Sequence, residues 1–187
     1  MSDQSNIPLI RDRLDLPRWL VQKGILLPIV EVGTLFGEYA EHLLEYFPGT
    51  VHVVDPWENQ PVTSYCDGCN AVNLPNAYLK TLARLERFGD RAVFHRKYSL
   101  NAALHFDEES LGAVFVDSNH SYESAQADIA MWYRKVVKGG IVAGHDFYNR
   151  HDDWHDCGVQ QAVEEFCAEM KLEFYTTECT SWWIHKP

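Results

Sequence analysis

Two segments of the sequence bring carboxylates and imidazoles together at spacings that suit metal binding or proton transfer. One places Asp117 three residues before His120, and the other places His145 directly before Asp146. Carboxylate oxygens and imidazole nitrogens are ligands for divalent cations such as Mg²⁺ or Mn²⁺. A histidine can also accept a proton near neutral pH. The structural alternative is that Asp117 caps the next helix while a histidine packs in a loop. The four residues together favour a functional site.

A glycine loop and an acid earlier in the chain indicate a binding site for a nucleoside-type cofactor. The apolar run 29–32 leads into Gly33 and Gly37, and the apolar run 51–54 ends at Asp55. The glycine spacing is not the G-x-G-x-x-G of dinucleotide-binding loops, and the chain contains no G-x-x-x-x-G-K-[ST] phosphate loop. The loop therefore favours a ligand without phosphates, with Asp55 accepting hydrogen bonds from ribose hydroxyls. The alternative for both features is an ordinary turn after a strand.

The segments that precede these residues are short and apolar, as is typical of strands buried in a parallel sheet. We expect strands over 29–32, 51–54, 92–95, 113–116 and 141–144, and a closing antiparallel pair over 172–176 and 181–185. We expect helices over 8–23, 37–46, 76–88, 99–106, 122–137 and 159–170. The alternation predicts an α/β fold with a doubly wound, mostly parallel, seven-stranded sheet. Parallel strands end at one edge of such a sheet, so both groups of residues should face one crevice.

The length of 187 residues predicts a single domain over 1–187, with a helical extension over 1–24 and an irregular insertion over 56–75. The segment 147–155 is rich in aromatic residues and histidines, and we expect it to be a loop. Two roles are open for this loop. It overhangs the crevice and selects the substrate, or it forms a solvated loop or a subunit contact.

The composition excludes several classes of function. Sixteen basic residues against 27 acidic residues give a formal net charge of −11, which argues against nucleic acid as a partner. No apolar run approaches the roughly 18 residues of a membrane span. The first residues lack the pattern of a secretion signal. We therefore predict a cytoplasmic protein that is not embedded in a membrane.

The five cysteines are expected to be reduced thiols, because the chain lacks a secretion signal. Cys66 and Cys69 form a C-x-x-C pair, but a structural zinc site commonly needs a second such pair, which this sequence does not have. The pair also lies in a loop context that differs from the strand–helix junction of thioredoxin-type motifs. Three interpretations of the pair stay open. It has no structural importance, it forms a labile disulfide, or it is part of a metal site.

The spacing Glu31-x-Gly33-x-x-x-Gly37 resembles the first motif of class I S-adenosylmethionine-dependent methyltransferases, with Asp55 at the position that usually binds the ribose. Four further segments are similar to a family of small-molecule O-methyltransferases. These segments are 117–123, 128–132, 139–147 and 158–166. The family includes metal-dependent O-methyltransferases of sugars in antibiotic biosynthesis and relatives that resemble cephalosporin hydroxylases. The resemblance covers roughly residues 25–185 and implies the Rossmann-like methyltransferase fold.

The resemblance also implies roles for individual residues. It implies a cofactor site formed by Glu31, Gly33, Thr34, Gly37, Asp55, Pro56, Ser99 and Asp117. It implies His120 and Asp117 as catalytic residues, with His120 as the general base, and Asp117, His145 and Asp146 as ligands of Mg²⁺ or Mn²⁺. The pair His145-Asp146 departs from the acid–acid pair of the sugar enzymes. The implied reaction transfers a methyl group from S-adenosyl-L-methionine to a hydroxyl of a small acceptor molecule, and homo-oligomer formation stays open.

Two other functions fit parts of the same pattern. A module that binds S-adenosylmethionine or S-adenosylhomocysteine without catalysis would use the same crevice. A metal-dependent hydrolase would use the four residues from Asp117 to Asp146, and it would not need the half of the site between Gly33 and Asp55.

Overall fold

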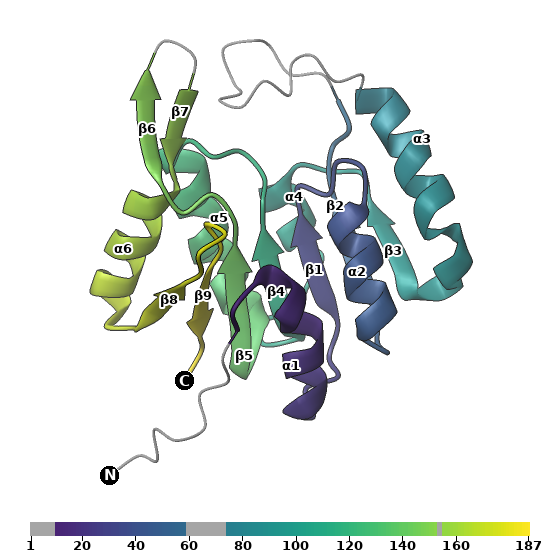
Figure 1. Cartoon of the computed structure of the whole chain (residues 1–187), viewed down its shortest axis with the longest axis horizontal. Coiled ribbons are helices and arrows are strands. Elements are labelled where there is room, and N and C mark those ends of the chain that lie inside the picture. Colours follow the sequence, from purple (N-terminus) through teal and green to yellow (C-terminus); the bar gives the residue numbers. More distant parts are fainter. Residues whose placement is uncertain (1–9, 59–73, 153–154) are drawn as a thin grey trace.

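The structure, a computed structural model, describes residues 10–58, 74–152 and 155–187. A seven-stranded sheet runs through the molecule with the strand order β3-β2-β1-β4-β5-β9-β8 (Figure 1). Its strands are β1 (Ile29–Val32), β2 (Val51–Val54), β3 (Ala92–His95), β4 (Leu111–Val116), β5 (Val136–Gly144), β8 (Phe174–Thr176) and β9 (Trp182–His185).

The pairing of the strands confirms the predicted fold class. Strands β1 to β5 pair in parallel, whereas β9 is antiparallel to both β5 and β8. Strands β1 and β4 are neighbours at the centre of the sheet. From β1 the chain continues to β2 and β3 on one side, and from β4 it continues to β5 on the other side. In a doubly wound sheet this reversal opens a crevice at the carboxyl ends of the central strands.

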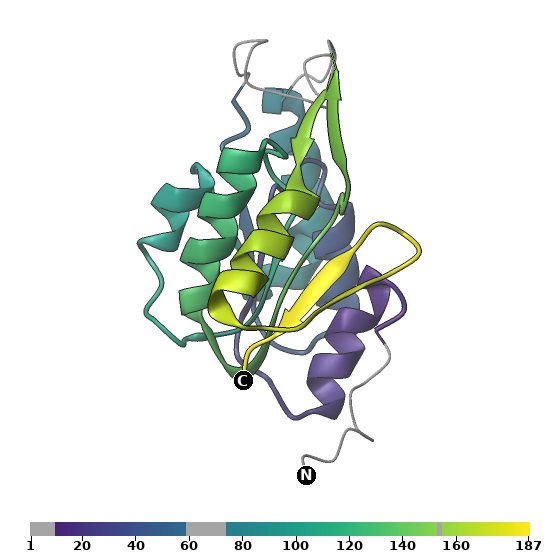
Figure 2. The ribbon, with the colours of Figure 1, turned by 90° about the vertical axis from the view of Figure 1, so that its left-hand side faces the viewer.

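Helices cover both faces of the sheet, as the side view in Figure 2 shows. One face carries the 3-10 turn η2 (Arg13–Asp15), α1 (Leu16–Gln22), α2 (Glu38–Tyr46) and α3 (Leu74–Leu85), which continues into η5 (Glu86–Arg91). The other face carries α4 (Ser99–Ala103), α5 (Tyr122–Lys135) and α6 (Val159–Met170). The helix predicted over 8–23 begins only at Leu16, because Pro17 suits the first turn of a helix and not its interior.

Alternation along β1 decides which of its residues reach each helical layer. Val30 and Val32 pack with the α4–α6 layer, whereas Ile29 packs with the layer that contains α1, α2 and α3. Because successive side chains of a strand point to opposite faces, Glu31 lies on the same side as Ile29. All residues of β1 are buried. The sheet therefore carries the Glu31 carboxylate into the protein interior close to the crevice.

The junction between α5 and β5 differs from the prediction. The helix ends at Lys135 and the strand begins at Val136, so Gly139 and Gly140 lie within β5 instead of stopping the helix. The register between β4 and β5 is irregular at this point, and Gly139 has a φ of 79°. Gly139 and Gly140 thus lie in a bulge of the strand. A pair of glycines at a bulge and a pair of glycines at a helix end look the same in the local sequence.

The segment 147–155, predicted as a loop, contributes to an antiparallel hairpin of β6 (Asn149–Asp152) and β7 (His155–Gly158). The hairpin projects beyond the carboxyl edge of the sheet (Figure 1). Its strands lack the alternation of apolar and polar residues that indicates a strand, so the sequence gives no signal for them.

The insertion predicted over 56–75 lies largely outside the described residues, as do Cys66 and Cys69, whereas Leu74 and Pro75 already belong to α3. None of the helices within the described ranges is long and apolar enough to cross a membrane.

Candidate functional site

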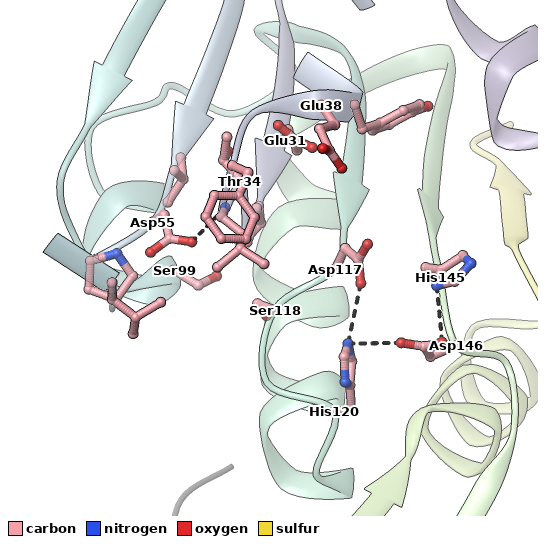
Figure 3. A pocket seen from close by; sticks show the side chains of 18 of the residues that line it. Glu31, Thr34, Glu38, Asp55, Ser99, Asp117, Ser118, His120, His145 and Asp146 are labelled. Atoms are coloured by element: carbon pink, nitrogen blue, oxygen red, sulfur yellow. Dashed lines mark hydrogen bonds and ion pairs between the residues drawn. The ribbon is translucent and has the colours of Figure 1, made fainter. Parts of the chain in front are cut away.

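A cavity of about 370 Å³ opens at the carboxyl ends of β1, β2, β4 and β5 (Figure 3). Its wall contains most of the residues that the sequence predicts for the site, namely Glu31, Gly33, Thr34, Asp55, Pro56, Ser99, Asp117, His120, His145 and Asp146. Gly37 is the exception. It lies at the N-cap of α2, with a φ of 73°, and a Cβ atom there would lie 2.8 Å from Cγ2 of Thr81 on α3. Gly37 therefore permits helix packing beside the cavity.

Gly33 permits a close approach between two parts of the backbone. Its φ is 89°, and a Cβ atom at this position would lie 1.9 Å from the carbonyl oxygen of Asp117. No side chain fits there. The glycine allows the loop after β1 to contact the segment after β4, so the two halves of the cavity meet at this point.

Asp55 fixes the loop after β1 to the end of β2. Its Oδ2 atom accepts the backbone N–H of Leu35 at 3.0 Å, and its Oδ1 atom accepts the backbone N–H of Trp57 at 2.7 Å. Burial raises the pKa of Asp55, although both hydrogen bonds act in the opposite direction. A carboxylate offers about four lone pairs. Asp55 therefore keeps acceptor capacity for a ligand hydroxyl after both loop bonds are made.

Glu31 is a buried acid with an unpaired oxygen. The residue is 3% exposed, and its Oε2 atom has no hydrogen-bond partner among the described residues. Burial raises the pKa of Glu31 well above its usual value, and the nearby carboxylates of Asp117 and Asp55 raise it further. A buried carboxylate is stabilised by a cation or a hydrogen-bond donor. Because Glu31 lines the cavity, a cationic group of a ligand would supply that partner.

Arg13 and Tyr39 line the cavity from elements that the sequence analysis did not connect with the site. The Nη1 atom of Arg13, in η2, lies 3.6 Å from Oδ2 of Asp117. The Tyr39 hydroxyl, on α2, donates to the backbone carbonyl of Arg13 at 2.8 Å. Sequence spacing carries no signal for either residue, because their position depends on how the N-terminal turn packs against α2.

A buried acid behind the cavity, Asp128 on α5, holds two of the serines that line it. Ser99 and Ser118 each donate a hydroxyl hydrogen to one oxygen of the Asp128 carboxylate. The indole N–H of Trp132 donates to Oγ of Ser99 at 2.9 Å. Asp128 and Trp132 are four residues apart and therefore share one face of the helix. The Ser99 hydroxyl hydrogen is already used, so only other atoms of Ser99 can donate to a cofactor.

Asp117, His120 and Asp146 form a compact cluster of candidate metal ligands (Figure 3). The Nε2 atom of His120 lies 3.3 Å from Oδ1 of Asp117 and 3.3 Å from Oδ2 of Asp146. One ligand atom from each of the three residues lies within 4.8 Å of the others. Two carboxylates and one imidazole match the preferences of a hard or borderline divalent cation.

His145 contacts this cluster from outside. Its Nδ1 atom lies 3.0 Å from Oδ1 of Asp146, and its Nε2 atom lies 3.4 Å from Oγ1 of Thr180. The hydrogen bond to Asp146 raises the pKa of His145. The structure therefore places His120 against both aspartates and His145 against Asp146. Asp146 itself has a φ of 55°, an unusual backbone conformation for a residue with a side chain. It marks the bend at which the chain leaves β5.

Comparison with known protein families identifies a match over most of the sheet. A family profile described as a methyltransferase domain matches residues 30–147. This range contains β2 to β5, all of β1 except its first residue, and every predicted site residue. A search among curated proteins finds no match.

Several solved structures share the fold. The O-methyltransferase NovP aligns with a TM-score of 0.66 at 17% identity, over 93% of this chain and 77% of its own. An O-methyltransferase from Bacillus cereus, in complex with S-adenosylhomocysteine, aligns with a TM-score of 0.66 at 16% identity, over 97% of this chain and 86% of its own. TomG from Streptomyces achromogenes, an O-methyltransferase involved in tomaymycin synthesis and bound to S-adenosylmethionine, aligns with a TM-score of 0.62 at 15% identity, over 94% and 80%. At these identities the likeness shows the fold.

Proposed function

This chain belongs to the methyltransferase-domain family, and from that premise we propose that it transfers the methyl group of S-adenosyl-L-methionine to a hydroxyl oxygen of a small acceptor molecule. One observation carries the proposal. The cavity that contains the buried acids Glu31 and Asp55 also contains the cluster around His120. A site for the cofactor and a site that can act on a hydroxyl therefore share one space. The O-methyltransferases with this fold support the same reaction.

The first half of the cavity fits S-adenosylmethionine. The carboxylate of Glu31, which lines the cavity, suits a cationic group of the methionine part, and the remaining lone pairs of Asp55 suit the ribose hydroxyls. The other proposed cofactor contacts are Gly33, Thr34, Pro56, Ser99 and Asp117. When bound, the cofactor supplies a methyl group activated by its sulfonium. The protein then has to hold the acceptor oxygen in line with that group.

The second half of the cavity fits a divalent cation, and we propose Asp117, His120 and Asp146 as the residues that would hold Mg²⁺ or Mn²⁺. A ring nitrogen between two carboxylate oxygens has to carry a hydrogen atom or share a cation with them. Its lone pair would otherwise face negative charge on both sides. When bound, such an ion would polarise the acceptor oxygen and favour loss of its proton.

The two proposed roles of His120 use its ring nitrogens differently. The Nε2 atom faces Asp117 and Asp146. As a metal ligand, His120 would use the Nε2 lone pair on the cation. As a general base, its Nε2 atom would carry the hydrogen that faces the carboxylates, and Nδ1 would accept the proton. The geometry favours the ligand role, because it pairs both carboxylates and the imidazole at once. Removal of metal separates the two assignments.

The proposed acceptor is a small molecule. A net charge of −11 disfavours the phosphate backbone of nucleic acids, and the cavity of about 370 Å³ lies within the range of small-molecule sites, roughly 300–1,000 Å³. The cytoplasmic location and the single-domain organisation stay predictions.

Calorimetry with S-adenosylmethionine and S-adenosylhomocysteine tests the cofactor half of the proposal. We expect one molecule bound per chain, and absence of binding would overturn the proposal. A panel of hydroxylated acceptors, read out by formation of S-adenosylhomocysteine, tests transfer. Binding of the cofactor without turnover on any acceptor would favour a binding module without catalysis.

A further inference from the structure

A second cavity lies at the opposite edge of the sheet from the methyltransferase site. Its volume is about 630 Å³, which exceeds the 370 Å³ of the first cavity. Trp19 on α1, Gly139 on β5 and His185 on β9 form parts of its wall. Gly139 belongs to the first half of β5, whereas Asp146 follows the carboxyl end of that strand. The length of β5 therefore separates the two cavities, and a ligand of the second one would not compete with the cofactor.

Aromatic rings form much of the wall. Tyr175 stacks on Trp183, with the ring centroids 4.3 Å apart and the planes at 19°. Trp19 meets His185 edge to face, with the centroids 6.2 Å apart. Trp19 and Trp183 are each only 4% exposed, so the surrounding protein holds these rings in place. Rigid aromatic walls favour a ligand that itself contains an aromatic ring.

Positive charge surrounds the cavity. Lys23, Lys138 and Lys171 border it, and Glu173 is the carboxylate among its lining side chains. The Glu173 carboxylate accepts the Tyr175 hydroxyl at 3.0 Å. The chain as a whole has a net charge of −11, so three lysines at one cavity create a local reversal of sign. Such a reversal attracts an anion.

Lys171 occupies a backbone position that glycine usually takes. Its N–H donates to the carbonyl of Ala168, and the N–H of Leu172 donates to the carbonyl of Cys167. These two bonds form the motif in which a left-handed residue ends a helix, and that residue is most often glycine. Lys171 has a φ of 56°. The chain thus accepts a strained backbone at a lysine that borders the cavity.

We propose that this cavity binds a small aromatic anion, meaning a flat ring that carries a carboxylate, sulfonate or phosphate group. The rings of Tyr175 and His185, which are more exposed than those of Trp19 and Trp183, contact the ring of the ligand. Lys138 and Lys171 bind its anionic group. The proposal is independent of the identity of the methyl acceptor, because the two cavities lie at opposite ends of β5.

The test uses anilinonaphthalene sulfonate, a flat aromatic anion that fluoresces more strongly in an apolar site. Saturating S-adenosylhomocysteine is present to occupy the first cavity. We expect saturable binding of one probe per chain. The double variant Lys138→Gln with Lys171→Gly should bind the probe about tenfold more weakly, since each exposed ion pair contributes a few-fold. The control Lys80→Gln, on α3 and outside this cavity, should leave the affinity unchanged.

The Lys171→Gly variant also separates binding from folding. Glycine relieves the left-handed backbone at this position, so the variant should unfold at no lower temperature than the unmodified protein while its affinity for the probe decreases. An uncharged analogue, phenylnaphthylamine, should bind more weakly than the sulfonate. Equal affinity for the two probes, equal affinity of the double variant, or displacement of the probe by S-adenosylhomocysteine would each overturn the proposal.

Discussion

The Oδ2 atom of Asp55 accepts the backbone N–H of Leu35 at 3.0 Å and so joins the end of β2 to the loop after β1. Leu35 is held in the left-handed region with a φ of 50°. Its carbonyl accepts the indole N–H of Trp57 and the hydroxyl of Thr81. The acid proposed to bind the ribose therefore also shapes the loop that lines the cavity.

Replacement of Asp55 by alanine should weaken both binding and folding. Two backbone N–H groups lose their acceptor, which costs about 1–3 kcal/mol of unfolding free energy for a buried group. The affinity for S-adenosylmethionine should fall about tenfold or more, because the ribose hydroxyls lose a charged partner. Calorimetry and urea unfolding measure the two effects. The matched control is Leu35→Gly, which relieves the left-handed backbone and keeps the carboxylate. Unchanged calorimetric binding in Asp55→Ala would contradict the proposed position of the ribose.

Replacement of His120 by alanine should suppress turnover and leave the cofactor affinity largely intact. The imidazole lies between Asp117 and Asp146, on the side of the cavity away from Asp55 (Figure 3). We expect a loss of about 100-fold or more in kcat, whether His120 binds a metal or accepts a proton. The control is His105→Ala, which replaces an exposed histidine that follows α4. Equal turnover in the variant would remove His120 from the mechanism.

A chelator separates the two roles of His120. If Asp117, His120 and Asp146 hold a cation, EDTA should abolish turnover, and Mg²⁺ or Mn²⁺ should restore it. Asp146→Asn should then weaken the metal affinity, because one charged ligand is lost. Turnover that is indifferent to EDTA would leave His120 as the general base of a metal-free site.

The buried Glu31 should make the free protein less stable as the pH rises. Its pKa is raised in the folded state, first by burial. The folded chain therefore keeps a proton that the unfolded chain releases, and stability falls from about pH 4.5 upward until the folded pKa is passed. Glu31→Gln removes this pH dependence, so the variant should gain stability relative to the unmodified protein as the pH increases. Unfolding free energies across this range measure the difference, and parallel profiles would refute it.

A histidine pair outside the cavity should produce a pH dependence of the opposite sign. The Nδ1 atom of His52 lies 2.9 Å from Nε2 of His95. Burial, and then the charge of His95, lower the pKa of His52 from 6.5 to about 4. Between these values the unfolded chain binds a proton that the folded chain does not, so stability falls as the pH decreases from 6.5 to about 4.

The variant His52→Phe tests this slope, since a phenyl ring keeps the edge contact with Phe106. We expect a flatter dependence of the urea midpoint on pH between 4 and 6.5, the range set by the two pKa values. His42→Phe, which replaces a histidine on α2, serves as the control. A slope that persists in His52→Phe would assign the effect to other groups.

The sequence alone determined the order of the elements and the edge at which the site lies. Strands β1, β2 and β3 and helix α6 have the predicted bounds, because short apolar runs and helical periodicity are local properties of the chain. Parallel strands end at a common edge. For this reason Asp55, Asp117 and Asp146 could be placed beside one cavity before any contact was known.

Only the tertiary structure decided which side chains meet inside that cavity. It placed His120 between the two aspartates and His145 beside Asp146, and it brought Arg13 to Asp117 from the N-terminal turn. Periodicity shows which side of an element is buried, but not which distant residue lies against it. That choice depends on backbone angles such as the φ of 55° at Asp146 and on the packing between layers, which no short stretch of sequence encodes.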